Sequence, residues 1–212
     1  MPVTAKICGL STTATLDAAI AGGASHVGFV FFPPSPRHVP FDHAAALAAR
    51  VPDHVARVGV FVAPDDETIT RAMQTARLSA IQLHRTAPER VAHLRRMTGA
   101  EAWAAVAVKT RSDLDVANSY TGAADRLLFD AKTPADAALP GGMGIRFDWS
   151  LLDGFRPPLA WALSGGIDAV NVAEAVARTG ATLVDTSSGV ETEPGVKNVD
   201  KIAAFLQSVR QL

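Results

Sequence analysis

Residues 4–9 read TAKICG, and the rest of the chain can be placed relative to this stretch. It is a short strand-like run that ends at Cys8, the only cysteine, after which Gly9 bends the chain. In a parallel α/β barrel, the carboxyl ends of all strands meet on one rim, where active sites are built. If this stretch opens such a barrel, the partners of Cys8 should stand at the carboxyl ends of later strands.

Strand-like and helix-like segments alternate from this stretch onward, at roughly 25 residues per unit. The expected strands cover residues 4–8, 26–32, 55–62, 80–84, 103–108, 126–130, 159–163 and 182–185. The pattern predicts a single-domain (β/α)8 TIM barrel of eight parallel strands over residues 1–212. An open doubly wound sheet is the competing architecture, but its dinucleotide-binding form carries GxGxxG after the first strand, where this chain reads CGLSTT.

Capping residues mark the helices between the expected strands. Hydroxyl residues at 11–13 are expected to open the first helix, Asp42 to cap the second, and the aspartates at 65–66 to open the third. Residues 112–120 are predicted as the fifth helix. The alternation then breaks at residues 131–146, a loop with two prolines and three glycines whose length is typical of a functional or mobile segment.

The composition argues against several classes of function. The net charge is −1 and neither sign of charge clusters, which disfavours a nucleic-acid or anionic-membrane partner. No uncharged stretch reaches the roughly 18 residues that a membrane span needs. One cysteine forms no intramolecular disulfide, and the histidines show no metal-binding spacing. We therefore expect a soluble cytoplasmic protein whose ligand is a small neutral or anionic molecule.

Two glycine-containing turns follow the last two expected strands. Gly165 and Gly166 follow the seventh strand, and Ser187, Ser188 and Gly189 follow the eighth. Backbone N–H groups in such turns, near helix N-termini, attract phosphate, and barrels often bind phosphate at these two loops. Either turn alone is equally well explained as a tight turn or a helix cap, but the pair favours a phosphate site.

Cys8 and Asp130 end the first and sixth expected strands, so they share one rim. Alone, such a cysteine is commonly a small buried hydrophobe and such an aspartate a cap. As a pair they can supply a base and an acid: help from Lys6 would influence how much thiolate exists, and burial beside Phe129 would favour a protonated carboxyl. An aldose-to-ketose rearrangement of a sugar phosphate requires such an acid and base.

Arg37 and His84 are further polar candidates on this rim. Arg37, in the proline-rich loop after the second strand, has a planar guanidinium that suits a carboxylate, although a lone loop arginine is usually solvated. His84 ends the fourth strand, where a structural role is the commoner one. Both are retained as candidate substrate-binding residues.

Together these motifs resemble those of the phosphoribosylanthranilate isomerase family. The resemblance rests on KICGL at 6–10, GFVF and SPR within 28–37, VGVFV at 58–62, QLH at 82–84, FDW at 147–149, SGGI at 164–167, DTSSGVE at 185–191 and GVKN at 195–198. Their order and spacing match over essentially the whole chain. The resemblance implies a barrel that converts N-(5-phosphoribosyl)anthranilate to 1-(2-carboxyphenylamino)-1-deoxyribulose 5-phosphate, an Amadori rearrangement in tryptophan biosynthesis, without a metal or organic cofactor.

The resemblance also implies a role for each candidate residue. Cys8 would be the general base that removes the proton from ribose C2, and Asp130 the general acid that protonates the ring oxygen. Arg37 would lie near the anthranilate carboxylate, and Asp185 would approach the sugar hydroxyls. The phosphate would be surrounded by Gly165, Gly166, Ser187, Ser188 and Gly189.

Four residues depart from the family's usual pattern. Arg85 stands where a glycine commonly follows QLH, and Met143 where a small hydroxyl residue is common. Ile145 and Arg146 replace a more polar pair. All four border the expected mouth of the site, so they bear on loop closure and substrate affinity, and not on the acid and the base.

Two other functions stay open at this point. Another phosphate-binding barrel isomerase, from histidine biosynthesis or acting on two substrates, would carry an aspartate where Cys8 stands. A barrel that binds a phosphorylated ligand without converting it would not need both Cys8 and Asp130. Both a monomer and a homodimer are compatible with the sequence.

Overall fold

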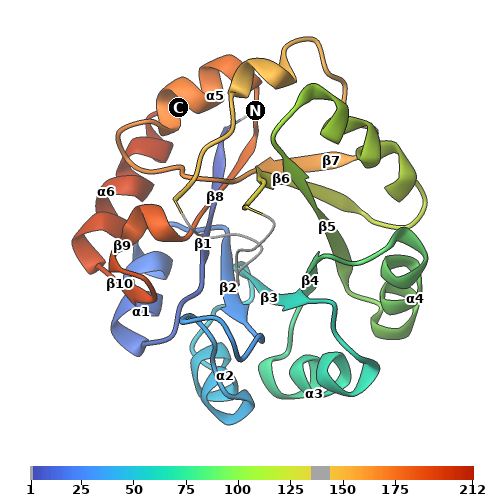
Figure 1. The fold of residues 1–212 in the computed structure, drawn as a ribbon. Helices are drawn as coiled ribbons and strands as arrows, with labels where there is room; N and C mark the ends of the chain where they lie inside the picture. The colour runs from blue at the N-terminus through green and yellow to red at the C-terminus, as the bar shows by residue number, and fades with distance from the viewer. Residues whose placement is uncertain (1, 135–143) are drawn as a thin grey trace.

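Eight parallel strands form a closed barrel in the computed structural model, which describes residues 2–134 and 144–212 (Figure 1). The strands are β1 (Thr4–Cys8), β2 (His26–Val30), β3 (Ala56–Val62), β4 (Ala80–His84), β5 (Glu101–Val108), β6 (Arg126–Ala131), β7 (Ala160–Leu163) and β8 (Leu183–Thr186). β1 pairs with β2 on one side and with β8 on the other, which closes the ring. The predicted fold class is confirmed.

Helical segments connect the strands and surround the barrel (Figure 1). The α-helices are α1 (Thr13–Ala21), α2 (Phe41–Ala48), α3 (Asp66–Ala76), α4 (Pro88–Thr98), α5 (Val172–Thr179) and α6 (Val199–Arg210). The 3₁₀-helices are η1 (Arg111–Tyr120), η2 (Trp149–Leu152) and η3 (Ser188–Val190), and a small hairpin is formed by β9 (Glu191–Glu193) and β10 (Val196–Lys197). Within the described ranges, no helix has the length and apolar character needed to cross a membrane.

Side-chain caps fix two of the predicted helix starts. The Thr12 hydroxyl accepts a hydrogen bond from the Thr15 backbone N–H at the start of α1, and Asp65 caps α3 in the same way. The prediction for Asp42 was wrong, because Pro40 occupies the cap position of α2. Asp42 lies in the first turn instead, where its charge still faces the positive end of the helix.

The segment predicted as the fifth helix is the 3₁₀-helix η1. It is rich in Asp, Ser and Asn, whose side chains bond to nearby backbone groups and compete with α-helical hydrogen bonds. Asp113 accepts hydrogen bonds from the backbone N–H groups of Lys109 and Thr110, at 2.9 and 2.8 Å. The segment is therefore helical as predicted, but more tightly wound.

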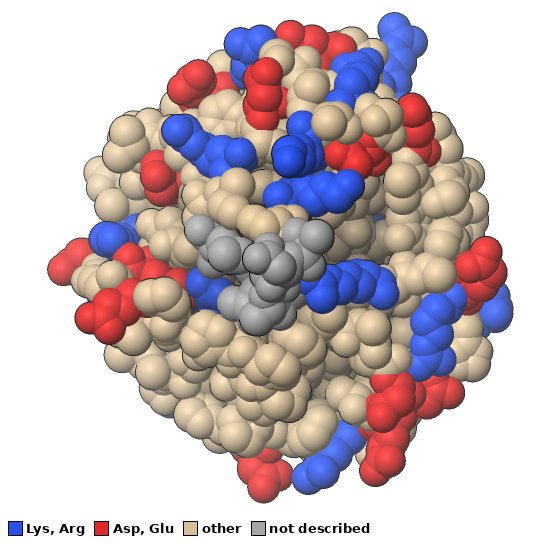
Figure 2. Space-filling view, in the orientation of Figure 1, with Lys and Arg blue, Asp and Glu red and all other residues tan. Residues whose placement is uncertain are grey.

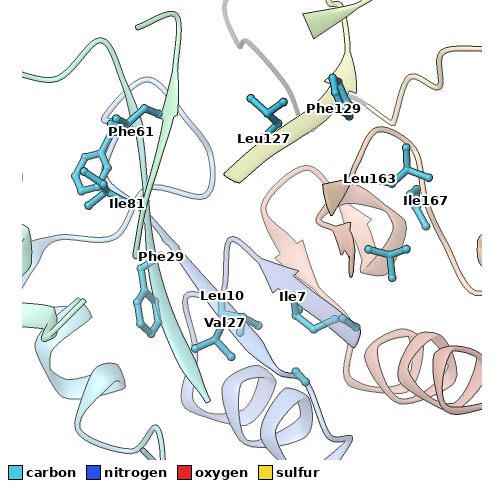
Figure 3. Packing of buried hydrophobic residues seen from close by; sticks show 14 of the residues in the cluster. Ile7, Leu10, Val27, Phe29, Phe61, Ile81, Leu127, Phe129, Leu163 and Ile167 are labelled. Carbon is cyan, nitrogen blue, oxygen red and sulfur yellow. The ribbon is translucent and has the colours of Figure 1, made fainter. Parts of the chain in front are cut away.

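Alternate residues of each strand face opposite sides of the barrel wall. Ile7, Phe29 and Phe129 belong to the large hydrophobic cluster that the helices cover (Figure 3). On the inner side, Trp103 and Leu128 belong to a separate cluster that fills the barrel. Two residues beyond Leu128 on β6 stands Asp130, so the same alternation that packs the interior delivers a polar side chain to the mouth.

Candidate active site

A pocket opens at the carboxyl ends of the strands and gathers nearly all of the candidate residues. It is lined by Cys8, Arg37, His84, Asp130, Gly165, Gly166, Asp185, Ser187 and Ser188, among others. Gly189 does not line it, and lies where an added Cβ would be 2.1 Å from the Ile167 carbonyl oxygen. The structure therefore brings together residues that are up to 180 positions apart in the sequence, as the barrel prediction required.

Cys8 contributes a buried thiol to this pocket. Its side chain packs with Val30 and Val60 on the inner side of the barrel. Burial raises the pKa of the Cys8 thiol above its ordinary value of 9.0, and the positive charge of Lys6 only partly opposes this effect. Lys6 thus favours the thiolate, as the sequence suggested, but burial outweighs it, so the protonated thiol dominates at neutral pH.

Asp130 presents a carboxyl group with the titration behaviour of a general acid. Its Oδ1 accepts a hydrogen bond from the Ala131 backbone N–H at 2.8 Å. Burial, followed by the negative charge of Asp185, raises the pKa of Asp130 to about 7. Phe129 was expected to supply part of this burial, but its ring packs against Phe155 and Trp161 on the outer side of the strand. The surroundings inside the pocket, and not the Phe129 ring, therefore raise the pKa of this carboxyl group.

Lys6 and Asp185 form an ion pair inside the barrel. Lys6 is 0% exposed, and its Nζ donates to Oδ1 of Asp185 at 2.9 Å. The second oxygen of Asp185, Oδ2, accepts a hydrogen bond from the Ser164 hydroxyl at 3.2 Å. Lys6 was not among the predicted site residues, although its position two residues before Cys8 on one strand indicates that both side chains face the same way.

Arg37 is buried, so the interpretation of a solvated loop arginine was wrong. Its Nε and Nη2 donate to the two carboxylate oxygens of Glu191, at 2.8 and 2.7 Å. Lys197 of β10 binds the same carboxylate and donates to the Ser187 carbonyl oxygen at 3.2 Å. Arg37 and Lys197 thus hold one carboxylate between two cationic side chains beside the pocket. Glu191 and Lys197 lie in motifs that were quoted for the resemblance, but neither was assigned a role.

His84 is a neutral member of the pocket. The side-chain amide nitrogen of Gln82 donates a hydrogen bond to Nε2 of His84 at 2.9 Å. Burial, assisted by the nearby charge of Lys6, lowers the pKa of His84 to about 4. At neutral pH the imidazole therefore offers hydrogen bonds and no charge.

The turns after β7 and β8 form one wall of the pocket, and Val30 and Val60 line another. Gly165 and Gly166 have φ angles of 89° and 63°, in the left-handed region that favours glycine. Within residues 2–134 and 144–212, the backbone N–H groups of these glycines and of Ser187 donate no hydrogen bond. The Thr186 hydroxyl donates to the Ile167 carbonyl oxygen at 2.6 Å and ties the two turns together.

Helix N-termini were expected near these two turns, but in the described part of the structure no α-helix begins at either, and only the 3₁₀-helix η3 begins there, at Ser188. α5 begins only at Val172, after a loop in which the Asn171 side chain donates to the Gly166 carbonyl oxygen at 2.9 Å. Beyond β8, η3 is a short 3₁₀-helix, and α6 begins at Val199. Any affinity of this wall for an anion therefore comes from the N–H groups of the turns themselves.

The four departures from the family pattern fall around the mouth. Arg85 has a φ of 50°, which explains why glycine is favoured there and costs Arg roughly 1–2 kcal/mol. Ile145 lines the pocket, and the Arg146 guanidinium lies 5.8 Å from the centre of the Trp149 ring. Met143 and the glycines at 141–142 lie outside the described residues.

Charge is unevenly spread around this site. Lys and Arg side chains stand near the middle of the face shown in Figure 2, whereas Asp and Glu side chains lie mostly toward its edges. The chain as a whole has a net charge of −1, so this local excess favours an anionic ligand. In the described part of the chain, no group of three or more His, Cys, Asp or Glu side chains is arranged to hold a metal ion.

Comparison with known proteins gives matches over the full barrel. A family model described as N-(5'phosphoribosyl)anthranilate (PRA) isomerase matches residues 5–208. A protein of Zymomonas mobilis subsp. pomaceae named N-(5'-phosphoribosyl)anthranilate isomerase is 55% identical, with 100% of each chain covered. Its namesake from Rhodospirillum centenum is 53% identical, with 97% of each chain covered.

Solved structures agree with these sequence matches. The crystal structure of phosphoribosyl anthranilate isomerase from Thermotoga maritima superposes with a TM-score of 0.87 at 34% identity, and covers 99% of this chain and 100% of its own. A second structure, of a phosphoribosyl anthranilate isomerase in complex with reduced 1-(o-carboxyphenylamino)-1-deoxyribulose 5-phosphate, has a TM-score of 0.82 at 32% identity and the same coverage. The chain therefore belongs to the N-(5'-phosphoribosyl)anthranilate isomerase family.

Proposed function

We propose that this chain carries out the reaction of its family, the isomerisation of N-(5'-phosphoribosyl)anthranilate, with Cys8 as general base and Asp130 as general acid. The observation that carries the assignment is that a buried thiol and a carboxyl group with a pKa of about 7 line one pocket, beside two turns whose N–H groups donate no hydrogen bond among the described residues. A non-catalytic binder has no need for a carboxyl group tuned to neutral pH.

The acid and the base act on two substituents of the same sugar carbon, C1: the ring oxygen and C2. Asp130 gives its proton to the ring oxygen, the C1–O bond breaks, and the anthranilate nitrogen forms an iminium with C1. The Cys8 thiolate then removes the proton from C2, which gives an enol conjugated to the nitrogen. The thiol proton is available for C1 as the enol becomes a ketone, and the enol proton returns to Asp130 through solvent. The protons balance over one turnover.

Opposite walls of the pocket suit the two ends of this substrate. The turns at Gly165 and Ser187 offer backbone N–H groups to the phosphate. Val30, Phe32 and Val60 supply an apolar wall for the aromatic ring. Arg37 lines the pocket with its guanidinium plane fixed by Glu191, and this planar cation suits the anthranilate carboxylate.

The proposed chemistry also bears on where and in what form the protein works. A thiol acts as a base only while it is reduced, which fits the cytoplasm better than an oxidising compartment. Cys8, Asp130 and the two turns belong to the same chain, so the proposed chemistry is compatible with either a monomer or a homodimer.

The direct test is conversion of the substrate by the purified chain, followed through the fluorescence of the anthranilate group. We expect catalytic turnover of N-(5'-phosphoribosyl)anthranilate. Saturable binding without conversion would instead assign a phosphorylated-ligand-binding protein. Conversion of the histidine-pathway aldose phosphate alone would assign a different barrel isomerase.

Gly189 provides a test of the phosphate wall. Its missing side chain lets the turn after β8 approach the turn after β7, since an added Cβ would lie 2.1 Å from the Ile167 carbonyl oxygen. We expect Gly189→Ala to separate the two turns, and to raise both KM and the inhibition constant of inorganic phosphate by at least about tenfold, or 1.4 kcal/mol. Gly180→Ala is the control, because no atom of the described residues lies within 4 Å of the Cβ position of Gly180; its positive φ of 70° adds backbone strain that Gly189→Ala does not have, so the control tests strain without a steric clash. Unchanged phosphate inhibition in Gly189→Ala would move the phosphate elsewhere.

A further inference from the structure

We propose that Lys6 is a positioning residue for Cys8. Its buried ammonium group lies between the Asp185 carboxylate and the Cys8 sulfur, and it stabilises the negative charge of the sulfur once the thiol has lost its proton. The inference rests on the proposed role of Cys8 as the base. It adds a residue inside the barrel, out of contact with solvent, to the machinery of the reaction.

The side chains of Lys6 and Cys8 converge on one point of the neighbouring strand. They stand two residues apart on β1, so both face the inside of the barrel. The point is Gly28 of β2, the register partner of Cys8, where an added Cβ would lie 3.1 Å from the Cys8 sulfur and 3.2 Å from Cε of Lys6. The absence of a side chain at Gly28 is what leaves room for the lysine stem and the thiol side by side.

The burial of Lys6 is difficult to explain by stability alone. A buried ion pair commonly adds no more to stability than an apolar pair of the same volume, because both ions lose their hydration. An apolar residue would fit the pattern of the barrel interior, where Trp103 and Leu128 already pack. The chain instead keeps a fully buried ammonium 2.9 Å from a carboxylate and next to its only thiol.

The charged groups that face Cys8 come from three elements and act with opposite signs. Lys6 on β1 and Lys197 on β10 lower the pKa of the thiol, whereas burial and Asp185 on β8 raise it. Burial acts to lower the pKa of Lys6, but the negative charges of Asp185 and of the Cys8 thiolate together outweigh it and raise that pKa above 10.5, so the ammonium stays charged while the thiol titrates. Loss of the thiol proton therefore gives Lys6 a second anionic neighbour, and no proton has to move to or from the lysine.

The test uses the fact that Cys8 is the only cysteine. The rate at which iodoacetamide alkylates Cys8 is measured against pH. The ultraviolet absorbance of the thiolate is measured over the same pH range, and it needs no reagent in the pocket. Cys8→Ser gives the background for both measurements. The informative pair is Asp185→Asn against Lys6→Met combined with Asp185→Asn, because neither variant leaves a carboxylate unpaired in the barrel. Lys109→Met, at an exposed lysine, is the control.

We expect the two substitutions to act in opposite directions. Asp185→Asn should speed alkylation at neutral pH, and adding Lys6→Met to it should slow alkylation at least about tenfold, which is one pKa unit of the thiol. Equal rates in the single and double variants, or slower alkylation in Asp185→Asn, would overturn the proposal. Since alkylation involves no substrate, this result is independent of turnover. If the thiol pKa shifts but kcat/KM falls at the same alkaline pH as before, Lys6 supports the thiolate as proposed, and the proposed role of Cys8 as the general base is what fails.

Discussion

Asp130→Asn is expected to lower kcat by about 10²–10⁴-fold and, at the same time, to stabilise the folded barrel at pH 8. The amide cannot donate a proton to the ring oxygen as a carboxylic acid does. It keeps an oxygen that accepts the hydrogen bond from the Ala131 N–H, so the pocket retains its shape. The loss is measured by anthranilate fluorescence at saturating substrate, with Asp115→Asn at an exposed position of η1 as the control.

The gain in stability follows from the raised pKa of Asp130. The carboxyl titrates at about 7 in the folded chain against 3.8 ordinarily, so between these pH values only the folded state holds the proton. Stability therefore falls as pH rises through this window, by up to about 4 kcal/mol, and stays low above it. Asn escapes this cost, so urea unfolding should find the variant more stable at pH 8 and no different below pH 4. Equal stability at pH 8 would show that the pKa of Asp130 is not raised in the folded chain.

The barrel was predictable because its strands leave a strong signal in the sequence. Each one is a short apolar run between helix signals, and parallel strands need such helices to connect them. The positions of Cys8 and Asp130 then follow from the rule that strand ends share one rim. The direction of Lys6 was equally available, since residues two apart on a strand face the same side. The same rule shows that Phe129, next to Asp130, faces the opposite side and cannot bury it.

Other features depend on contacts that no local pattern specifies. The partner of Arg37 comes from a hairpin of β9 and β10, and 154 residues separate Arg37 from Glu191. Several residues separate the Gly166 turn from the start of α5. Their conformation depends on the Asn171 side chain, which donates a hydrogen bond to the Gly166 carbonyl oxygen before the helix begins. The pKa of Asp130 lies below that of Cys8, and both values depend on burial and on the charge of Asp185, which raise both of them.

This order sets the pH dependence of the unmodified chain. The active form has Asp130 protonated and Cys8 ionised, although the carboxyl titrates at about 7 and the thiol above 9.0. kcat/KM should rise tenfold per pH unit below pH 7, because the fraction of Cys8 thiolate rises. Between pH 7 and the thiol pKa it should stay flat, because the protonated fraction of Asp130 falls as steeply as the thiolate fraction rises. Above the thiol pKa it should fall. On the plateau fewer than about one molecule in a hundred is in the active form, given this gap of at least two units.

Cys8→Ser is expected to cost at least as much turnover as Asp130→Asn, about 10²–10⁴-fold or more, because a hydroxyl is a far weaker acid than a thiol and gives no comparable base. The residual kcat/KM of Cys8→Ser should follow the protonated fraction of Asp130 alone. It should be flat below pH 7 and fall above pH 7, where kcat/KM of the unmodified chain stays constant. The residual activity of Asp130→Asn should do the opposite and climb with the thiolate across the same range. Measured profiles of kcat/KM from pH 5 to 10 separate the two. If both variants keep the parental plateau, neither residue carries the proton it is assigned; if the slopes are exchanged, Cys8 is the acid and Asp130 the base.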